Sequence, residues 1–264
     1  MQSLDRVFDI LEAFGHSGSK LGVTELGNLT GLHKSTVYRF LSALEVRGYV
    51  VREVETGKYS LGYRILELSK HVLDKLEIRQ QAKLHLENLV QQCGETVYLV
   101  ALESGETVYI DRVEGTKNLR LRSNIGSRGY AHSSASGKIL LSEMPSRDLQ
   151  KIVEEKGLIA LTNSTITDFD DLVQALLTVR EQGFAFDDIE NEEDVRCIAA
   201  PIRDFRGKII AAVSISGPST RMTLERLKNE LRNMIVDTAN QISINMGYHK
   251  AEIKGKRFNN HYFD

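Results

Sequence analysis

The chain of 264 residues has few of the features that would place a protein in a membrane, outside the cell or around a metal cluster. No stretch approaches the roughly 18 consecutive apolar residues that a membrane-spanning helix needs, and the first residues lack the apolar core of a secretion signal. The two cysteines, Cys93 and Cys197, are too few for a disulfide framework or a cysteine-built metal cluster. We therefore expect a cytoplasmic protein that works without a membrane, a metal or another cofactor.

An excess of positive charge is also missing. The formal net charge is −2, which weighs mildly against nucleic-acid binding, because Lys and Arg are the residues that neutralise phosphates. If DNA is the partner, the basic residues must be concentrated locally. The remaining composition, 41% hydrophobic and 27% charged, is typical of a globular protein, and the length suits two domains.

The first 62 residues have the pattern of a winged helix-turn-helix domain. Apolar residues recur at helical spacing over residues 4–14, a second helical stretch follows, and a third covers residues 34–48. The turn before the third stretch is short and contains Gly31, as a helix-turn-helix requires. Two short strands on either side of Glu55-Thr56-Gly57 then predict a β-hairpin, the wing.

Residues 63–78 predict a linker helix, and residues 79–250 predict a second domain. From Glu95 the apolar period changes to two, with a hairpin around Ser104-Gly105. Further strands are expected at residues 119–123, 184–186, 199–203 and 209–215, and helices at residues 137–144, 147–156, 168–182 and 224–246. Strands joined by hairpins and interleaved with helices predict an α+β domain on a mainly antiparallel sheet. The polar residues 251–264 show no apolar period and are expected to form a flexible tail.

The start of the third helical stretch is the candidate for reading DNA. A recognition helix enters the major groove with its N-terminal residues at the base edges. We expect DNA contacts from His33, Lys34, Ser35, Thr36, Tyr38 and Arg39, and from Arg52 and Lys58 on the hairpin. The alternative is a small helical domain whose charges are only solvated, since seven basic and seven acidic residues balance over residues 1–62. The placement of the charges along the sequence favours DNA binding, because Glu45 is the only acidic residue between Leu26 and Arg52.

Several motifs in order resemble those of the IclR family of bacterial transcriptional regulators. One is the stretch Lys34-Ser35-Thr36-Val37-Tyr38-Arg39-Phe40-Leu41, and another is a signature in which Gly183, Asp187 and Glu190 precede Cys197-Ile198-Ala199. The resemblance covers nearly the whole chain and fails only in the C-terminal tail. Among subgroups, the chain is most similar to regulators of 2-keto-3-deoxygluconate metabolism, which belong to pectin and sugar-acid catabolism. The shared features include Asn118-Leu119-Arg120 and Met246-Gly247-Tyr248-His249.

The resemblance implies a GAF- or profilin-like effector domain that binds a small organic acid on one side of its sheet. By resemblance we assign ligand contacts to Ala135, Ser136, Asp187, Cys197, Ser214 and Ser216, with Leu121 and Gly129 as weaker lining candidates. Small residues at a predicted helix start offer backbone N–H groups to a carboxylate. Ser214 and Ser216 lie two apart on a strand, so their hydroxyls share a face. Asp187 suits the hydroxyls of a sugar acid, and Gly129 leaves room for a ligand larger than glyoxylate or pyruvate.

Each of these residues also has a purely structural explanation. A serine pair decorates many strands, a lone cysteine is usually a small core residue, and an aspartate often stabilises a turn. The combined motif, and none of its members alone, favours a ligand site.

We expect a homo-oligomer, a dimer or a dimer of dimers, on a pseudo-palindromic double-stranded DNA operator, because helix-turn-helix proteins read paired half-sites with matching symmetry. The resemblance favours the dimer of dimers. Repression relieved by the ligand is the mechanism we favour. Activation stays open, as does an effector of another class, such as glyoxylate, pyruvate or an aromatic acid.

Other classes of function fit less well. Gly137-Lys138 resembles the end of a phosphate-binding loop, but the earlier glycine and the following Ser or Thr of that motif are absent. Cys197 or Ser134 with His132 would suit a hydrolase, yet no nucleophile-elbow motif surrounds either residue, and the histidines and cysteines lack paired zinc-ligand spacing. We therefore expect no enzyme. A ligand sensor that does not bind DNA is the remaining rival, and the polar start of the third helical stretch disfavours it.

Overall fold

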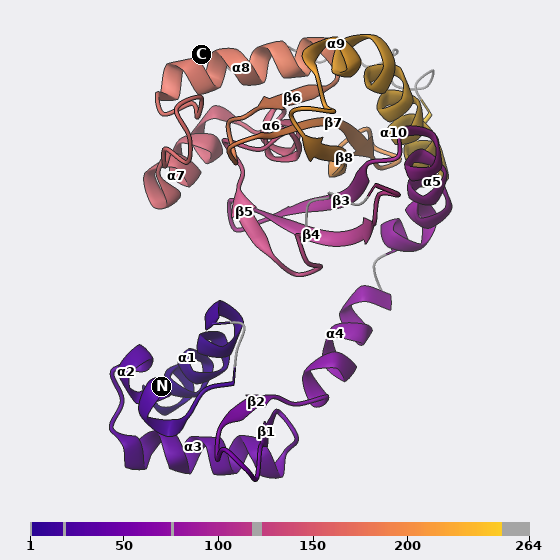
Figure 1. The fold of residues 1–264 in the computed structure, drawn as a ribbon. Coiled ribbons are helices and arrows are strands. Elements are labelled where there is room, and N and C mark those ends of the chain that lie inside the picture. The colour runs from indigo at the N-terminus through magenta and orange to yellow at the C-terminus, as the bar shows by residue number, and fades with distance from the viewer. Residues whose placement is uncertain (1, 18–19, 75–76, 118–122, 250–264) are drawn as a thin grey trace. The chain divides into compact units, whose positions relative to one another are not determined.

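The computed structural model describes residues 2–17, 20–74, 77–117 and 123–249. The chain divides into two compact units, Met1–Lys75 and Leu76–Asp264, and Figure 1 labels the elements of both. Within the described ranges, no helix is long and apolar enough to cross a membrane.

The first unit consists of short helices and one hairpin. Its elements are α1 (Gln2–Ser17), α2 (Val23–Thr30), α3 (Lys34–Val46), β1 (Val50–Arg52), β2 (Tyr59–Leu61) and α4 (Arg64–Asp74). β1 and β2 pair antiparallel, and Leu21 forms a bridge with Tyr59. Apolar side chains of α1, α2, α3 and the hairpin form one core, which contains Ile10, Phe14, Leu26, Val37, Leu41, Leu44 and Val50. The predicted winged helix-turn-helix is confirmed.

A left-handed glycine before α3 and a close approach of the backbone after it fix the chain around this helix. Gly31 ends α2 in the left-handed region at φ 68°, which glycine adopts without strain. Gly62, at the end of the hairpin, passes so near Gly48 that a Cβ atom at position 62 would lie 2.1 Å from the Gly48 carbonyl oxygen. The hairpin is therefore packed against the C-terminal end of α3.

The second unit is an antiparallel sheet with helices on both faces (Figure 1). Its helices are α5 (Glu77–Cys93), α6 (Ala135–Leu141), α7 (Ser146–Lys156), α8 (Phe169–Gln182), α9 (Leu224–Arg226) and α10 (Arg232–Asn245), with a π-helical turn at Leu227–Leu231 between the last two. Its strands are β3 (Thr96–Glu103), β4 (Glu106–Val113), β5 (Arg128–Tyr130), β6 (Ala185–Asp188), β7 (Val195–Arg203) and β8 (Ile209–Pro218). The strand order is β5-β4-β3-β8-β7-β6, and every adjacent pair is antiparallel.

The pleat of the strands separates two apolar layers. Val97, Ile198 and Ile215 belong to the core that α5 and α10 cover. On the other face, Ala199 and Ala212 pack against α6, and α7 and α8 pack around α6 in turn. Small alanine side chains let α6 lie close to the sheet, and this second face holds the polar residues described below.

The predicted elements agree with the structure in most places. Helices expected at residues 147–156, 168–182 and 224–246 are confirmed, with small shifts at their ends. The helix expected from residue 137 begins earlier, at Ala135, because the Ser134 hydroxyl caps it by accepting a hydrogen bond from the Gly137 N–H at 3.1 Å. The sequence does not predict β5, since three residues are too few for a period of two. The strand expected at residues 119–123 lies, except for Ser123, outside the described residues.

Candidate DNA-binding face and effector site

The N-terminal turn of α3 presents a row of polar side chains to solvent. His33 is its N-cap residue, with Nδ1 2.8 Å from the Ser35 hydroxyl and 3.4 Å from the Ser35 backbone nitrogen. The side chains exposed here are His33, Lys34, Ser35, Tyr38 and Arg39, and Thr36 is half-buried beside them. The first turn contains no acid, because Glu45 lies near the other end of α3. The structure thus places the six predicted residues at the N-cap and in the N-terminal half of this helix.

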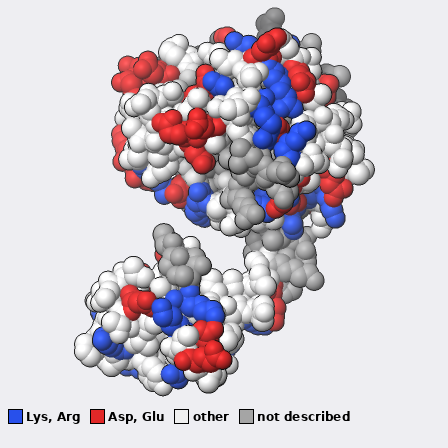
Figure 2. All heavy atoms as spheres, viewed as in Figure 1, with Lys and Arg blue, Asp and Glu red and all other residues white. Residues whose placement is uncertain are grey.

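The two hairpin residues predicted to contact DNA also make contacts within the unit. Lys58 Nζ lies 3.1 Å from the Glu25 carboxylate, and the Arg52 guanidinium carbon lies 5.9 Å from the centre of the Tyr59 ring. On the face of this unit seen in Figure 2, acidic and basic side chains lie next to one another. Pairing with Glu25 lowers the net positive charge that Lys58 offers to a phosphate.

The strand register aligns four predicted residues on the sheet face beneath α6. Asp187 pairs with Cys197, which pairs with Ser216 on the next strand. Ser214 lies two residues from Ser216 on the same face, as predicted, and the two hydroxyl oxygens are 3.5 Å apart. We call Asp187, Cys197, Ser214 and Ser216 the polar patch.

The helix α6 covers the polar patch and contains two more predicted residues, Ala135 and Ser136, both buried. Its start fits tightly, since a Cβ atom at Gly137 would lie 2.1 Å from the Ala131 carbonyl oxygen. The next residue, Lys138, is buried, and its Nζ donates to Glu190 Oε1 in the turn after β6. Sequence reasoning missed this ion pair because 52 positions separate its partners.

Asp187 differs from the rest of the polar patch because it is ionisable near neutral pH. It is only 1% exposed. Its Oδ1 accepts hydrogen bonds from the N–H groups of Glu190 at 2.8 Å and Asn191 at 3.3 Å, whereas Oδ2 has no hydrogen-bond partner among the described residues. Burial raises the pKa of Asp187 to about 7, against the lowering effect of the two backbone N–H groups. Near neutral pH, Oδ2 is therefore available to a ligand as a donor or as an acceptor.

Burial favours the neutral form of a thiol, two phenols and an imidazole near Asp187. It raises the pKa of the Cys197 thiol well above its usual value, raises the pKa of Tyr109 to about 12, raises the pKa of Tyr98 and lowers the pKa of His132. The rings of Tyr98 and Tyr109 pack edge to face with centroids 5.0 Å apart. Sequence reasoning missed both tyrosines as site residues. The available signal was the string Gly-Glu-Thr-Val-Tyr, which occurs twice and ends on each of them.

Of the two weaker candidates, the structure describes only Gly129, which is not part of this arrangement. Gly129 lies on β5, at the edge of the sheet opposite β6. A Cβ atom there would lie 3.0 Å from the Thr107 hydroxyl oxygen, so Thr107 occupies the space that the sequence suggested for a ligand. Leu121 falls outside the described residues.

The residues considered for catalysis make structural hydrogen bonds. His132 Nε2 lies 3.1 Å from the Ile159 carbonyl oxygen. The Ser134 hydroxyl donates to the Tyr130 carbonyl oxygen at 3.2 Å while it caps α6. Nowhere in the described part of the chain do three or more His, Cys, Asp or Glu residues form a group that could hold a metal ion.

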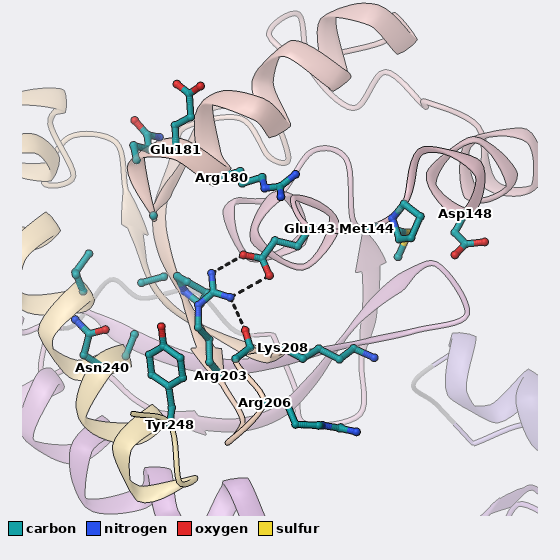
Figure 3. Close-up of a pocket in the computed structure, with 18 residues that line it drawn as sticks. Glu143, Met144, Asp148, Arg180, Glu181, Arg203, Arg206, Lys208, Asn240 and Tyr248 are labelled. Carbon is teal, nitrogen blue, oxygen red and sulfur yellow. Dashed lines mark hydrogen bonds and ion pairs between the residues drawn. The ribbon is translucent and has the colours of Figure 1, made fainter. Parts of the chain in front are cut away.

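A separate groove of about 930 Å³ lies between the start of α7, the end of α8, the β7–β8 turn and α10 (Figure 3). None of the described residues predicted to contact the effector lines it. Within it, Arg203 donates to both carboxylate oxygens of Glu143, at 2.9 and 2.6 Å, and to the Gly207 carbonyl oxygen at 2.7 Å. The charges of Arg203 and Glu143 neutralise each other, whereas in the polar patch beneath α6 the Asp187 Oδ2 atom has no hydrogen-bond partner among the described residues.

A recognition helix with an exposed polar start, a hairpin wing and a separate sheet domain define the class of two-domain DNA-binding regulators. Comparison with known proteins then gives the family. The family model described as the IclR helix-turn-helix domain matches residues 3–54, and that of the bacterial transcriptional regulator IclR C-terminal region matches residues 70–244. The chain belongs to the IclR family and is a DNA-binding transcriptional regulator rather than an enzyme.

The similarity extends over nearly the full length of known members. The HTH-type transcriptional regulator KdgR of Escherichia coli is 39% identical over 249 residues, which is 94% of each chain. The crystal structure of the Thermotoga maritima IclR matches with a TM-score of 0.77 at 33% identity, over 94% of this chain and all of that one. An IclR homologue from Microbacterium hydrocarbonoxydans, solved with 4-hydroxybenzoate, matches with a TM-score of 0.80 at 26% identity, over 92% and 98% of the two chains. The similarity to KdgR supports the predicted subgroup.

Proposed function

We propose that this regulator represses transcription by binding a pseudo-palindromic operator, and that it releases the DNA when a small organic acid binds to the polar patch. One observation supports the ligand site above all. Asp187 Oδ2 and Glu190 Oε2 are buried and have no hydrogen-bond partner among the described residues. An unsatisfied buried polar atom costs about 1–3 kcal/mol, so a ligand that bonds to these oxygens would recover that free energy.

We infer that the effector is a keto sugar acid such as 2-keto-3-deoxygluconate. Its hydroxyl groups suit Asp187, Ser214 and Ser216, and its carboxylate suits the small residues Ala135 and Ser136 at the start of α6. The similarity to KdgR favours this class. Glyoxylate, pyruvate or an aromatic acid is the alternative, and the homologue solved with 4-hydroxybenzoate favours the aromatic acid among these.

On the DNA side, Lys34 and Arg39 would contact phosphate or guanine, and the neighbouring hydroxyls would contact phosphates or base edges. We propose a dimer or a dimer of dimers in the cytoplasm, because helix-turn-helix proteins read paired half-sites with matching symmetry. Residues 63–78 would link the ligand domain to the DNA-binding domain. The ligand must bind one arrangement of the paired recognition helices more tightly than another in order to change DNA affinity.

Calorimetry with 2-keto-3-deoxygluconate tests the ligand site. Asp187→Ala and Ser214→Ala should each weaken binding by about tenfold or more, because each removes a hydrogen bond and leaves its partner unpaired. Ser164→Ala, at an exposed loop position, is the matched control and should bind like the parent. If the two patch variants, folded by circular dichroism, bind the acid as well as the parent does, the acid does not bind at the polar patch.

A further inference from the structure

Two carboxyl groups and one lysine are buried together beneath α6. Asp187, Glu190 and Lys138 are each less than 9% exposed, and Lys138 Nζ donates to Glu190 Oε1. The single lysine therefore neutralises Glu190. Among the described residues, Asp187 forms no such ion pair, since its Oδ1 accepts from two backbone N–H groups and the neutral Cys197 thiol lies against its carboxyl group.

Among the described residues, no cation besides Lys138 acts on Asp187. The titratable groups that act on Asp187 are Lys138 from α6, Glu190 from the following turn, Cys197 from β7 and Tyr109 from β4. Glu192 lies beside Cys197, Tyr98 beside Tyr109, and His132 near Glu190. The thiol and the phenols are neutral, and burial lowers the pKa of His132, which favours the uncharged imidazole. An organic anion placed beside ionised Asp187 would thus create two like charges in a buried site, which is energetically unfavourable.

We propose that the effector anion binds to the polar patch together with a proton, which is taken from water and held on Asp187 Oδ2. The inference rests on the proposed function, because it requires an organic acid at the polar patch. The proton converts the unpartnered Oδ2 from an acceptor into a hydroxyl that donates to an oxygen atom of the bound anion, such as one of its hydroxyl oxygens. No covalent bond other than this O–H bond forms, and the buffer replaces the proton that the water gives up. The ligand stays an anion, since free carboxylic acids of this kind have pKa values below about 5 and are ionised above that pH.

Proton uptake makes the affinity for the anion depend on pH. The pKa of Asp187 is raised to about 7 by burial, so the free site is mostly protonated at pH 6 and mostly ionised at pH 8. Below pH 6, the dissociation constant should be constant, because the proton is already bound. Above the pKa of Asp187, the dissociation constant should rise about tenfold per pH unit, the slope for uptake of one proton.

The test is calorimetry of the full chain with 2-keto-3-deoxygluconate at pH 6, 7 and 8, in pairs of buffers with different ionisation enthalpies. The wild type should take up close to one proton at pH 8 and close to none at pH 6. Asp187→Asn keeps an acceptor oxygen for the backbone N–H groups and puts an N–H donor in place of Oδ2. This variant should bind with a dissociation constant that does not change with pH.

Asp188→Asn is the matched control. Asp188 is the next residue along β6, and its carboxylate pairs with Arg196, so this variant should keep the pH slope of the wild type. The inference is overturned if the wild type binds the acid with an affinity that does not depend on pH, or if the affinity of Asp187→Asn changes with pH as steeply as expected for the wild type. Either result leaves the ligand site in place. If 2-keto-3-deoxygluconate, pyruvate, glyoxylate and 4-hydroxybenzoate all fail to bind at any pH, the proposed function is wrong and this inference falls with it.

Discussion

Replacing Asp187 with asparagine should stabilise the second unit at pH 8 and change it little at pH 4. Burial raises the pKa of this carboxyl from 3.8 to about 7 in the folded protein. Between these values, the folded protein binds more protons than the unfolded chain, so the free energy of unfolding decreases as pH rises. This rise in the pKa of Asp187 corresponds to about 4 kcal/mol of unfolding free energy. The wild type loses that stability between the two pKa values, and the variant does not.

Asparagine is suited to this test because it preserves the local hydrogen bonds. Its Oδ1 still accepts from the N–H groups of Glu190 and Asn191, which lie 2.8 and 3.3 Å from the Asp187 oxygen. Its amide nitrogen replaces Oδ2, whose burial without a partner makes the negative charge unfavourable.

The measurement is urea unfolding, followed by circular dichroism, at several pH values from 4 to 8. The unfolding free energies of the variant and the wild type are compared at each pH, so that the contributions of the other titrating groups cancel. The difference in unfolding free energy should grow with pH toward about 4 kcal/mol in favour of the variant. Asp188→Asn should show no such growth. If Asp187→Asn were equally stable relative to wild type at both ends of the range, or less stable at pH 8, the ionised carboxylate would be stabilised by its surroundings and our reasoning would be refuted.

Three further predictions concern other parts of the chain. Arg39→Ala should weaken operator binding, measured by fluorescence anisotropy, about tenfold. Lys83→Ala, on an exposed part of α5, is the control and should bind like the wild type. Equal affinities of Arg39→Ala and the wild type would exclude Arg39 from the interface. Gly137→Ala should cost about 3 kcal/mol in urea unfolding, because its Cβ would lie 2.1 Å from the Ala131 carbonyl oxygen; an unchanged midpoint would show that α6 can move away. Glu95 is 1% exposed and pairs with two arginines, so Glu95→Gln should cost about 3 kcal/mol at pH 7. Burial opposes ionisation of Glu95, but the two arginines hold its pKa below the usual value. The stability that the ion pairs contribute should therefore be lost as the pH falls below about 4.5. Equal stability of the variant and the parent at pH 7 would contradict this prediction.

The fold follows from the sequence wherever the signal is local. The helical spacing and Gly31 place α3 correctly, and the hairpin follows from two short apolar runs around a glycine-containing turn. The three-residue strand β5 has too short a pattern to be seen. The helix α6 begins two residues before its predicted start, because Ser134 caps it ahead of the apolar residues from which the helix was predicted.

The candidate site could be predicted only in part, because it is formed by contacts between distant segments. The two-residue spacing of Ser214 and Ser216 on β8 predicts that their hydroxyls share one face, and the family resemblance adds Asp187 and Cys197 to the site. The ion pair between Lys138 and Glu190 depends on how α6 lies over the β6–β7 turn, which no local pattern encodes. For the same reason, the sequence did not show that Thr107 fills the space beside Gly129.

The most direct test of the central claim is fluorescence anisotropy of the purified protein on labelled DNA from the region upstream of its own gene, at two salt concentrations, with and without 2-keto-3-deoxygluconate. We expect tight binding to one fragment, weakened by salt and released by the sugar acid, and we expect Ser214→Ala to bind the same fragment but to resist release. The proposal that the polar patch controls DNA binding would be contradicted by specific DNA binding that no organic acid changes. It would also be contradicted if the sugar acid released the Ser214→Ala variant as efficiently as the wild type.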